Sequence, residues 1–152
     1  MKSKFFEKYN HNPIASDYDE NISNEDNPVR TGYKSLLNRV KEKSQESKNI
    51  IDLWCWTGNT SLSLKNFDKL YCIDISTNMI DIAKQKLNNK WNITFIEDDL
   101  LSFFNNFSFK KNSIDLIVST YAIHHLTQEE KHILFQKTYD ILPNWWKIIF
   151  WD

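Results

Sequence analysis

Six tryptophans occupy positions at which the surrounding sequence pattern predicts glycine. Residues 49–60 read N-I-I-D-L-W-C-W-T-G-N-T, and glycine in place of Trp54 and Trp56 would make a glycine-rich turn between a strand and a helix. Indoles obstruct such a turn, because glycine alone adopts left-handed backbone conformations freely. Glycine would also make turns of residues 90–92 and 144–147. The six tryptophans are Trp54, Trp56, Trp91, Trp145, Trp146 and Trp151.

The composition indicates a reason for this pattern. The chain has 152 residues with 2 Gly and 6 Trp, whereas ordinary usage of roughly 7% predicts about ten glycines. Arg30 and Arg39 are the only arginines among 19 basic residues, and Asn and Ile are abundant, as in AT-rich genes. We hypothesise that the source reads the UGA codon as glycine, and that these six residues are glycines translated as tryptophan. The alternative is that six genuine tryptophans occupy glycine positions.

Length and charge narrow the class of protein. The length predicts one domain, with residues 1–27 as a polar lead-in and residues 28–152 as the domain proper. The net charge of -1 gives no general attraction to nucleic acid, so a small-molecule partner is expected. No signal peptide or membrane-spanning run is visible, which predicts a cytoplasmic protein. Cys55 and Cys72 lack partners at metal-ligand spacing, so reduced thiols and no metal site are expected.

Short apolar runs alternate with helical patterns along the chain. This alternation predicts a doubly wound α/β fold: a Rossmann-like parallel sheet covered on both faces, with strand order 3-2-1-4-5. Thr127 and Glu130 form an expected capping box, and Ser76 is an expected N-cap. The expected strands are 50–54, 70–73, 93–96, 114–119 and 148–150, and the expected helices are 28–47, 60–66, 76–88 and 128–142.

Two acidic residues frame the unusual turn. Asp52 precedes it, and Asp74 ends the next expected strand, 22 positions later. That spacing suits one strand-helix-strand step, in which the turn presents backbone N–H groups to a ligand. The second carboxylate can then accept hydrogen bonds from two ribose hydroxyls.

With these residues the sequence resembles the class I S-adenosylmethionine-dependent methyltransferases, whose first motif is D/E-x-G-x-G-x-G. Two of the three motif glycines are replaced here, at Trp54 and Trp56. The resemblance extends to residues 15–19, 74–79 and 97–100, to residues 119–126 and to the stretch before the last strand at 142–148. It covers nearly all of this chain but about two-thirds of a complete domain, so the usual C-terminal strand pair is expected to be lacking through truncation.

The resemblance implies S-adenosylmethionine as the cofactor and assigns roles around it. The amino-acid end would lie on Asp52 and the turn, beneath Tyr18, and the ribose on Asp74. The adenine would lie between Ile75 and Met79 and would be addressed by Asp99 and Leu100. The transferred methyl would face Ser119 and Thr120 at the end of the fourth strand. The implied cofactor residues are Tyr18, Asp52, Trp54, Cys55, Trp56, Gly58, Asp74, Ile75, Met79, Asp98, Asp99, Leu100, Ser119 and Thr120.

Other interpretations remain open at several of these positions. Met79 at helical spacing also suits a core residue, and Asp98 and Asp99 also suit caps of a following turn. His124 and His125 are candidate general bases, although one of them also suits a core position and the other an exposed one. A methyl transfer needs a base only when the acceptor atom is protonated. The absence of an N/D-P-P-Y motif argues against nucleobase or glutamine amino groups as acceptors.

Two other functions remain as alternatives to a small-molecule methyltransferase. An NAD-dependent dehydrogenase would share the turn and the acid of the second strand. A non-catalytic domain would have indoles filling its cofactor site. The sequence indicates neither the acceptor nor the oligomeric state.

Overall fold

The computed structural model describes residues 14–23, 26, 28, 31–144 and 147–151. Helices and strands alternate along them, as the sequence predicts. In chain order the elements are α1 (Tyr18–Ser23), α2 (Tyr33–Lys43), β1 (Asn49–Leu53), α3 (Asn59–Ser63), β2 (Lys69–Asp74), α4 (Thr77–Lys86), β3 (Ile93–Glu97), α5 (Leu100–Asn106), β4 (Leu116–Thr120), the 3₁₀ turn η2 (Ile123–His125), α6 (Gln128–Ile141) and β5 (Lys147–Trp151).

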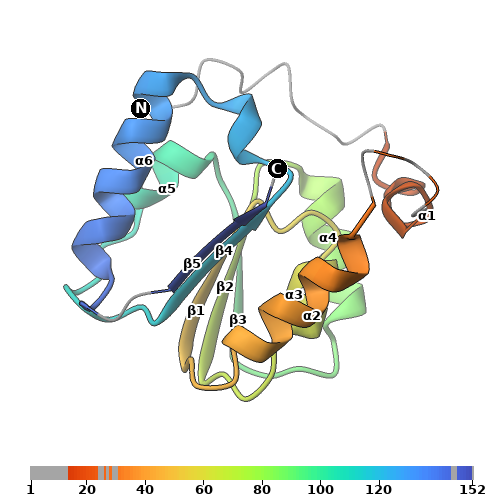
Figure 1. Cartoon of the computed structure of the whole chain (residues 1–152), viewed down its shortest axis with the longest axis horizontal. Coiled ribbons are helices and arrows are strands. Elements are labelled where there is room, and N and C mark those ends of the chain that lie inside the picture. Colours follow the sequence, from red (N-terminus) through yellow and green to blue (C-terminus); the bar gives the residue numbers. More distant parts are fainter. Residues whose placement is uncertain (1–13, 24–25, 27, 29–30, 145–146, 152) are drawn as a thin grey trace.

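The five strands form one parallel sheet in the order β3-β2-β1-β4-β5. The predicted fold class and strand order are therefore confirmed. Helices α2, α3 and α4 cover one face of the sheet, and α5 and α6 cover the other (Figure 1). β1 lies in the middle with Ile50, Ile51 and Leu53 fully buried, because a central strand covered on both faces needs apolar side chains on both.

Two local capping predictions are also confirmed. The Thr127 hydroxyl accepts a hydrogen bond from the Glu130 backbone N–H at 3.2 Å, and the Glu130 carboxylate accepts one from the Thr127 N–H at 2.9 Å. The Ser76 hydroxyl accepts a hydrogen bond from the Met79 N–H at 3.2 Å. These contacts satisfy N–H groups in the first turns of α6 and α4.

Several boundaries differ from the prediction because single residues leave the regular backbone conformation. β1 ends at Leu53, since Trp54 has a φ of 65°. α3 ends at Ser63 instead of residue 66, because Leu64 is extended, with a ψ of 143°. α2 begins only after Gly32, whose φ of 89° is incompatible with a right-handed helix. β4 begins at 116 instead of 114, and α4 ends at 86 instead of 88.

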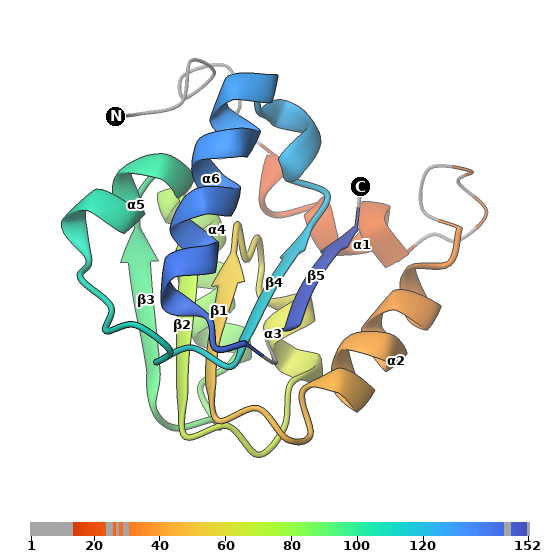
Figure 2. The ribbon, with the colours of Figure 1, turned by 60° about the vertical axis from the view of Figure 1, so that its left-hand side comes forward.

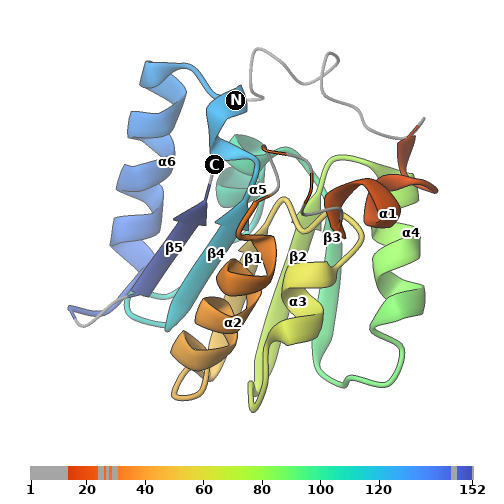
Figure 3. The same cartoon turned by 45° about the vertical axis from the view of Figure 1, so that its right-hand side comes forward.

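Two helices were not predicted. α5 follows β3 and carries the buried Leu100, Leu101 and Phe103. α1 lies within the expected lead-in, and Ile22 anchors it with only 1% of its surface exposed. In Figures 2 and 3 α1 lies toward the end of the sheet at which the strand arrowheads point. This is the end where ligands bind in open α/β sheets.

β5 is an edge strand, and its central residues are only partly buried. In the part of the chain that the structure describes, no helix is both long and apolar enough to cross a membrane.

Candidate functional site

The carboxyl ends of β1, β2 and β4 meet around the turn at residues 54–58. Leu53 pairs with Ile73 of β2, and Asp52 pairs with Val118 of β4. The chain order reverses between β1 and β4, so this point is a topological switch, where the crevice of a doubly wound sheet opens.

The backbone of the turn has the conformation that glycine favours. φ is 65° at Trp54, 52° at Trp56 and 85° at Gly58. A left-handed conformation costs a residue with a Cβ about 1–2 kcal/mol. The Cys55 N–H donates to the Ile73 carbonyl at 2.8 Å, and the Gly58 N–H donates to the Cys55 carbonyl at 2.8 Å. The turn thus takes the glycine-rich shape although it carries two indoles.

The two indoles are buried in the turn rather than turned out into solvent. Trp54 and Trp56 are each only 6% exposed. Their rings stack with centroids 5.6 Å apart, and the Tyr18 ring stacks on Trp56 at 4.9 Å and 15°. The Trp56 indole N–H donates to the Thr120 carbonyl of β4 at 2.8 Å. A layer of three aromatic rings therefore extends across the switch point.

The residues expected around an adenosine group, except Met79, line one cavity, but little space remains among them. This cavity has a volume of about 10 Å³, and Trp54 also lines it. This volume suffices for about one water molecule. The Trp54 indole N–H is buried without a hydrogen-bond partner among the described residues. The lining residues are Trp54, Asp74, Ile75, Asp98, Asp99 and Leu100.

Asp52 and Asp74 are buried carboxyl groups. Asp74 accepts hydrogen bonds from the backbone N–H groups of Trp56 and Ser76, both at 2.9 Å. One oxygen of Asp52 accepts from the Ser61 hydroxyl at 2.6 Å, and the other has no partner among the described residues. Burial raises the pKa of each carboxyl to about 7, although these hydrogen bonds act to lower it. A buried acceptor without a donor points to a missing polar partner.

Asp98 and Asp99 make the capping contacts considered from the sequence. Asp99 is the N-cap of α5 and accepts from the N–H groups of Leu101 and Ser102 at 2.9 and 3.3 Å. Asp98 accepts from the Asp99 N–H at 2.8 Å. Asp98 and Asp99 make these contacts and also line the cavity beside Trp54.

The end of β4 and the following turn hold the remaining candidates. The Ser119 hydroxyl donates to the Leu53 carbonyl at 2.8 Å, and the hydroxyls of Ser119's neighbour Thr120 and of Thr60 lie 3.1 Å apart. His124 is exposed. His125, the other candidate base, packs on the Trp54 ring, with the ring centroids 5.2 Å apart. His125 therefore contacts the turn.

Two further candidates have mainly structural surroundings. Met79 is fully buried, and it is absent from the residues that line the cavity. The Cys55 thiol lies 3.7 Å from the Trp56 carbonyl, and burial raises its pKa well above the ordinary value.

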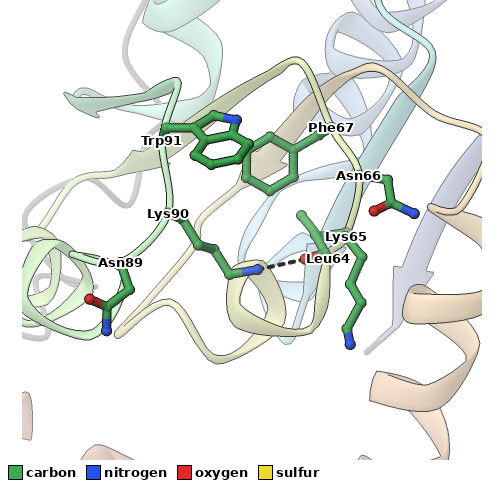
Figure 4. A pocket seen from close by; sticks show the side chains of 7 residues that line it. All are labelled: Leu64, Lys65, Asn66, Phe67, Asn89, Lys90 and Trp91. Atoms are coloured by element: carbon green, nitrogen blue, oxygen red, sulfur yellow. Dashed lines mark hydrogen bonds between the residues drawn. The ribbon is translucent and has the colours of Figure 1, made fainter.

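A roomier hollow lies at the opposite end of the sheet. It has a volume of about 190 Å³ and is formed by the loops that precede β2 and β3 (Figure 4). The Lys90 ammonium donates to the Leu64 carbonyl at 2.6 Å, and Trp91 is 76% exposed. This is the amino end of the strands, away from the switch point.

Comparison with known proteins identifies the family. A family model described as a methyltransferase domain matches residues 50–144. The chain belongs to this methyltransferase family. It is 39% identical over 142 residues to an uncharacterized methyltransferase of Bacillus mycoides, covering 91% of this chain and 63% of that protein. A relative in Bacillus thuringiensis is 38% identical over the same length. The chain thus spans a little under two thirds of these methyltransferases.

Solved methyltransferase structures share the fold. The complex of DhpI with S-adenosylhomocysteine superposes with a TM-score of 0.71 at 16% identity, covering 92% of this chain and 64% of DhpI. The N-methyltransferase NodS of Bradyrhizobium japonicum, solved with S-adenosylhomocysteine, gives a TM-score of 0.65 at 20% identity, with coverage of 88% and 68%. The prediction that the chain is a class I methyltransferase is confirmed at the level of the family.

Proposed function

We propose that this protein, with glycine at positions 54 and 56, transfers a methyl group from S-adenosylmethionine to a small-molecule acceptor. The observation that carries the proposal is the left-handed backbone at Trp54 and Trp56, at a switch point framed by Asp52 and Asp74. The backbone has kept the conformation of a glycine-rich cofactor turn, and the solved relatives DhpI and NodS hold S-adenosylhomocysteine.

The turn that carries tryptophan at positions 54 and 56 does not fit the cofactor. Trp54 fills the space beside Asp74, where a cavity of about 10 Å³ remains. Trp56 blocks the approach to Thr120, because its indole N–H donates to the Thr120 carbonyl. Removing both indoles would open a path between the adenine-side residues and the end of β4. The carboxylate of Asp74 would then be available for two hydroxyl groups, and the free oxygen of Asp52 for an ammonium group or a water molecule.

A non-catalytic domain is a second candidate function, and the same contacts support it. Stacked indoles with one satisfied N–H make a packed interior, which suits a non-catalytic domain that has lost its cofactor. The unpartnered indole N–H of Trp54 and the two left-handed tryptophans argue against a site optimised for indoles, since both features cost stability.

A small acceptor is favoured over nucleic acid by charge. The net charge of -1 gives no general attraction to the phosphate backbone of a nucleic acid. The acceptor atom would be held in line with the methyl near Ser119 and Thr120. Positioning is the main requirement of such a transfer, and His124 and His125, in the turn that follows β4, are the candidates for proton acceptance.

Calorimetric titration with S-adenosylhomocysteine tests the proposal. The four proteins are the chain as written, the Trp54→Gly/Trp56→Gly double variant, the same variant with Asp74→Ala, and Trp91→Gly. Trp91→Gly is the matched control, because it removes an exposed indole at the other end of the sheet. We expect tight binding by the double variant and no binding by the tryptophan-bearing chain or by Trp91→Gly. Adding Asp74→Ala to the double variant should weaken binding by about 1.5–3 kcal/mol, because a charged acceptor is lost.

Three results contradict parts of this scheme. Equal, tight binding by the chain as written would show that the indoles do not block the site. Absence of binding by the double variant would favour the non-catalytic domain. Binding of NADH in place of S-adenosylhomocysteine would favour the dehydrogenase.

A further inference from the structure

A polar cluster fastens α1 to the turn and to α4. The Asp19 carboxylate pairs with the Lys86 ammonium at 2.5 Å. The other carboxylate oxygen accepts from the Asn59 amide at 2.9 Å and from the Thr57 hydroxyl. Lys86 also donates to the Asn59 side-chain oxygen at 2.7 Å and to the Thr57 hydroxyl at 3.1 Å. Three separate parts of the chain therefore meet in one network.

This ion pair differs from the exposed pairs of the molecule. The Lys86 side chain is only 18% exposed, and that of Asp19 is 42% exposed. Burial raises the pKa of Asp19, but the hydrogen bond and charge of Lys86, with the hydrogen bonds from Thr57 and Asn59, outweigh it and hold the pKa below the ordinary value. Shielded, multiply bonded pairs are stronger than freely solvated ones.

The cluster lies directly beside Tyr18 in the chain. α1 has six residues, which is too short for a helix to persist without tertiary contacts. Asp19 is adjacent to Tyr18, whose ring covers Trp56 of the turn. On the other side, Thr57 and Asn59 flank Gly58. The same carboxylate thus holds the cover and fixes the exit of the turn beneath it.

We propose that Asp19 is a positioning residue that, through Lys86, Thr57 and Asn59, keeps Tyr18 closed over the cofactor turn and so limits cofactor release. The closing of α1 concerns the protein by itself. Its effect on the cofactor rests on the proposed function.

Hydrogen exchange of the chain as written tests the closing. The variants are Asp19→Ala, Lys86→Met and the double variant, with Asp81→Asn as the matched control. Asp81 forms an exposed ion pair with Lys84 on the same α4, at 3.1 Å. We expect amides of residues 18–23 to exchange about tenfold faster in each single variant, as loss of charged hydrogen bonds implies. Amides of β1 should exchange as before, which shows that the fold is intact.

The double variant completes a mutant cycle. If the two residues act as a pair, the double variant exchanges no faster than either single variant. Additive effects, or unchanged exchange in Asp19→Ala, would overturn the proposal.

The cofactor effect is measured in the Trp54→Gly/Trp56→Gly background. Adding Asp19→Ala should raise the dissociation rate of S-adenosylhomocysteine about tenfold, while Asp81→Asn leaves it unchanged. The thermal midpoint of each variant is measured in parallel, because a merely structural role would lower the midpoint without changing the release rate. An unchanged release rate would overturn the positioning role. If the background binds no S-adenosylhomocysteine, the proposed function fails and the exchange experiment still decides whether Asp19 closes α1.

Discussion

The indole N–H of Trp56 donates to the backbone carbonyl of Thr120 at 2.8 Å. This bond joins the turn after β1 to the end of β4, across the crevice where a doubly wound sheet binds its ligand. The side chain that makes it comes from a residue whose backbone is left-handed. The backbone at Trp56 therefore forms a turn that suits a ligand, whereas the Trp56 side chain closes that turn.

The codons for the six tryptophans are expected to be UGA in the source gene. At Trp54 and Trp56 the left-handed φ values support glycine. Trp91 and Trp151 are not left-handed, so glycine there is expected from the sequence alone, and Trp145 and Trp146 lie outside the described residues. Gene sequencing and peptide mass spectrometry of the natively produced protein check this. UGG at most of the six positions would rule out the reassignment.

Replacing Trp54 by glycine should lower the stability of the ligand-free protein while it opens the site. Removal of a buried indole costs about 3–5 kcal/mol, and relief of the left-handed backbone returns about 1–2 kcal/mol. The free energy of unfolding should fall by about 1–4 kcal/mol in urea titrations. Trp91→Gly should change it by less than about 1 kcal/mol, since that indole is exposed. A stability gain in Trp54→Gly would show that the indole packs poorly in its site.

Gly58→Ala should destabilise the protein more than Gly32→Ala. Both glycines are left-handed, with φ of 85° and 89°. A Cβ at 58 would lie 3.2 Å from both Ala83 Cβ and Leu87 Cδ1, whereas a Cβ at 32 would meet nothing closer than 4.0 Å. Strain alone predicts about 1–2 kcal/mol for each, and crowding adds to Gly58→Ala only. Equal shifts of the urea midpoint would mean that α4 moves away without cost.

Stability should decrease as the pH rises toward neutrality. The pKa values of Asp52 and Asp74 are raised to about 7 in the folded protein, against about 3.9 in an unfolded chain. Between these values the folded state binds more protons than the unfolded state, so the free energy of unfolding falls as pH rises from about 4 to about 7. Urea titrations at pH 5 and pH 8 measure the difference. Asp52→Asn should reduce it, while the exposed Asp81→Asn should not. A higher stability at pH 8 would contradict this assignment.

The sequence was sufficient for the sheet and for the methyltransferase family, and its limits have physical reasons. Continuous apolar strands and acids at strand ends are local signals, so strand order, Asp52 and Asp74 could be predicted. α5 was missed because its phenylalanines follow no clear helical period. α1 was missed because its stability comes from Asp19 contacts with residues far along the chain. The sequence could not tell which of His124 and His125 is packed, since the contact of His125 with the Trp54 ring forms only in the folded protein.

The stacked indoles affect the outcome of any activity assay of the tryptophan-bearing protein. A group held beside a site by its own backbone competes as if present at millimolar concentration or above. Cofactor supplied at micromolar concentration would displace this tethered competitor only if its affinity for the site were about a thousandfold higher. Below that affinity, a screen of acceptors with the tryptophan-bearing protein would return uniform inactivity, and that result would describe the indoles rather than the substrate range of the enzyme.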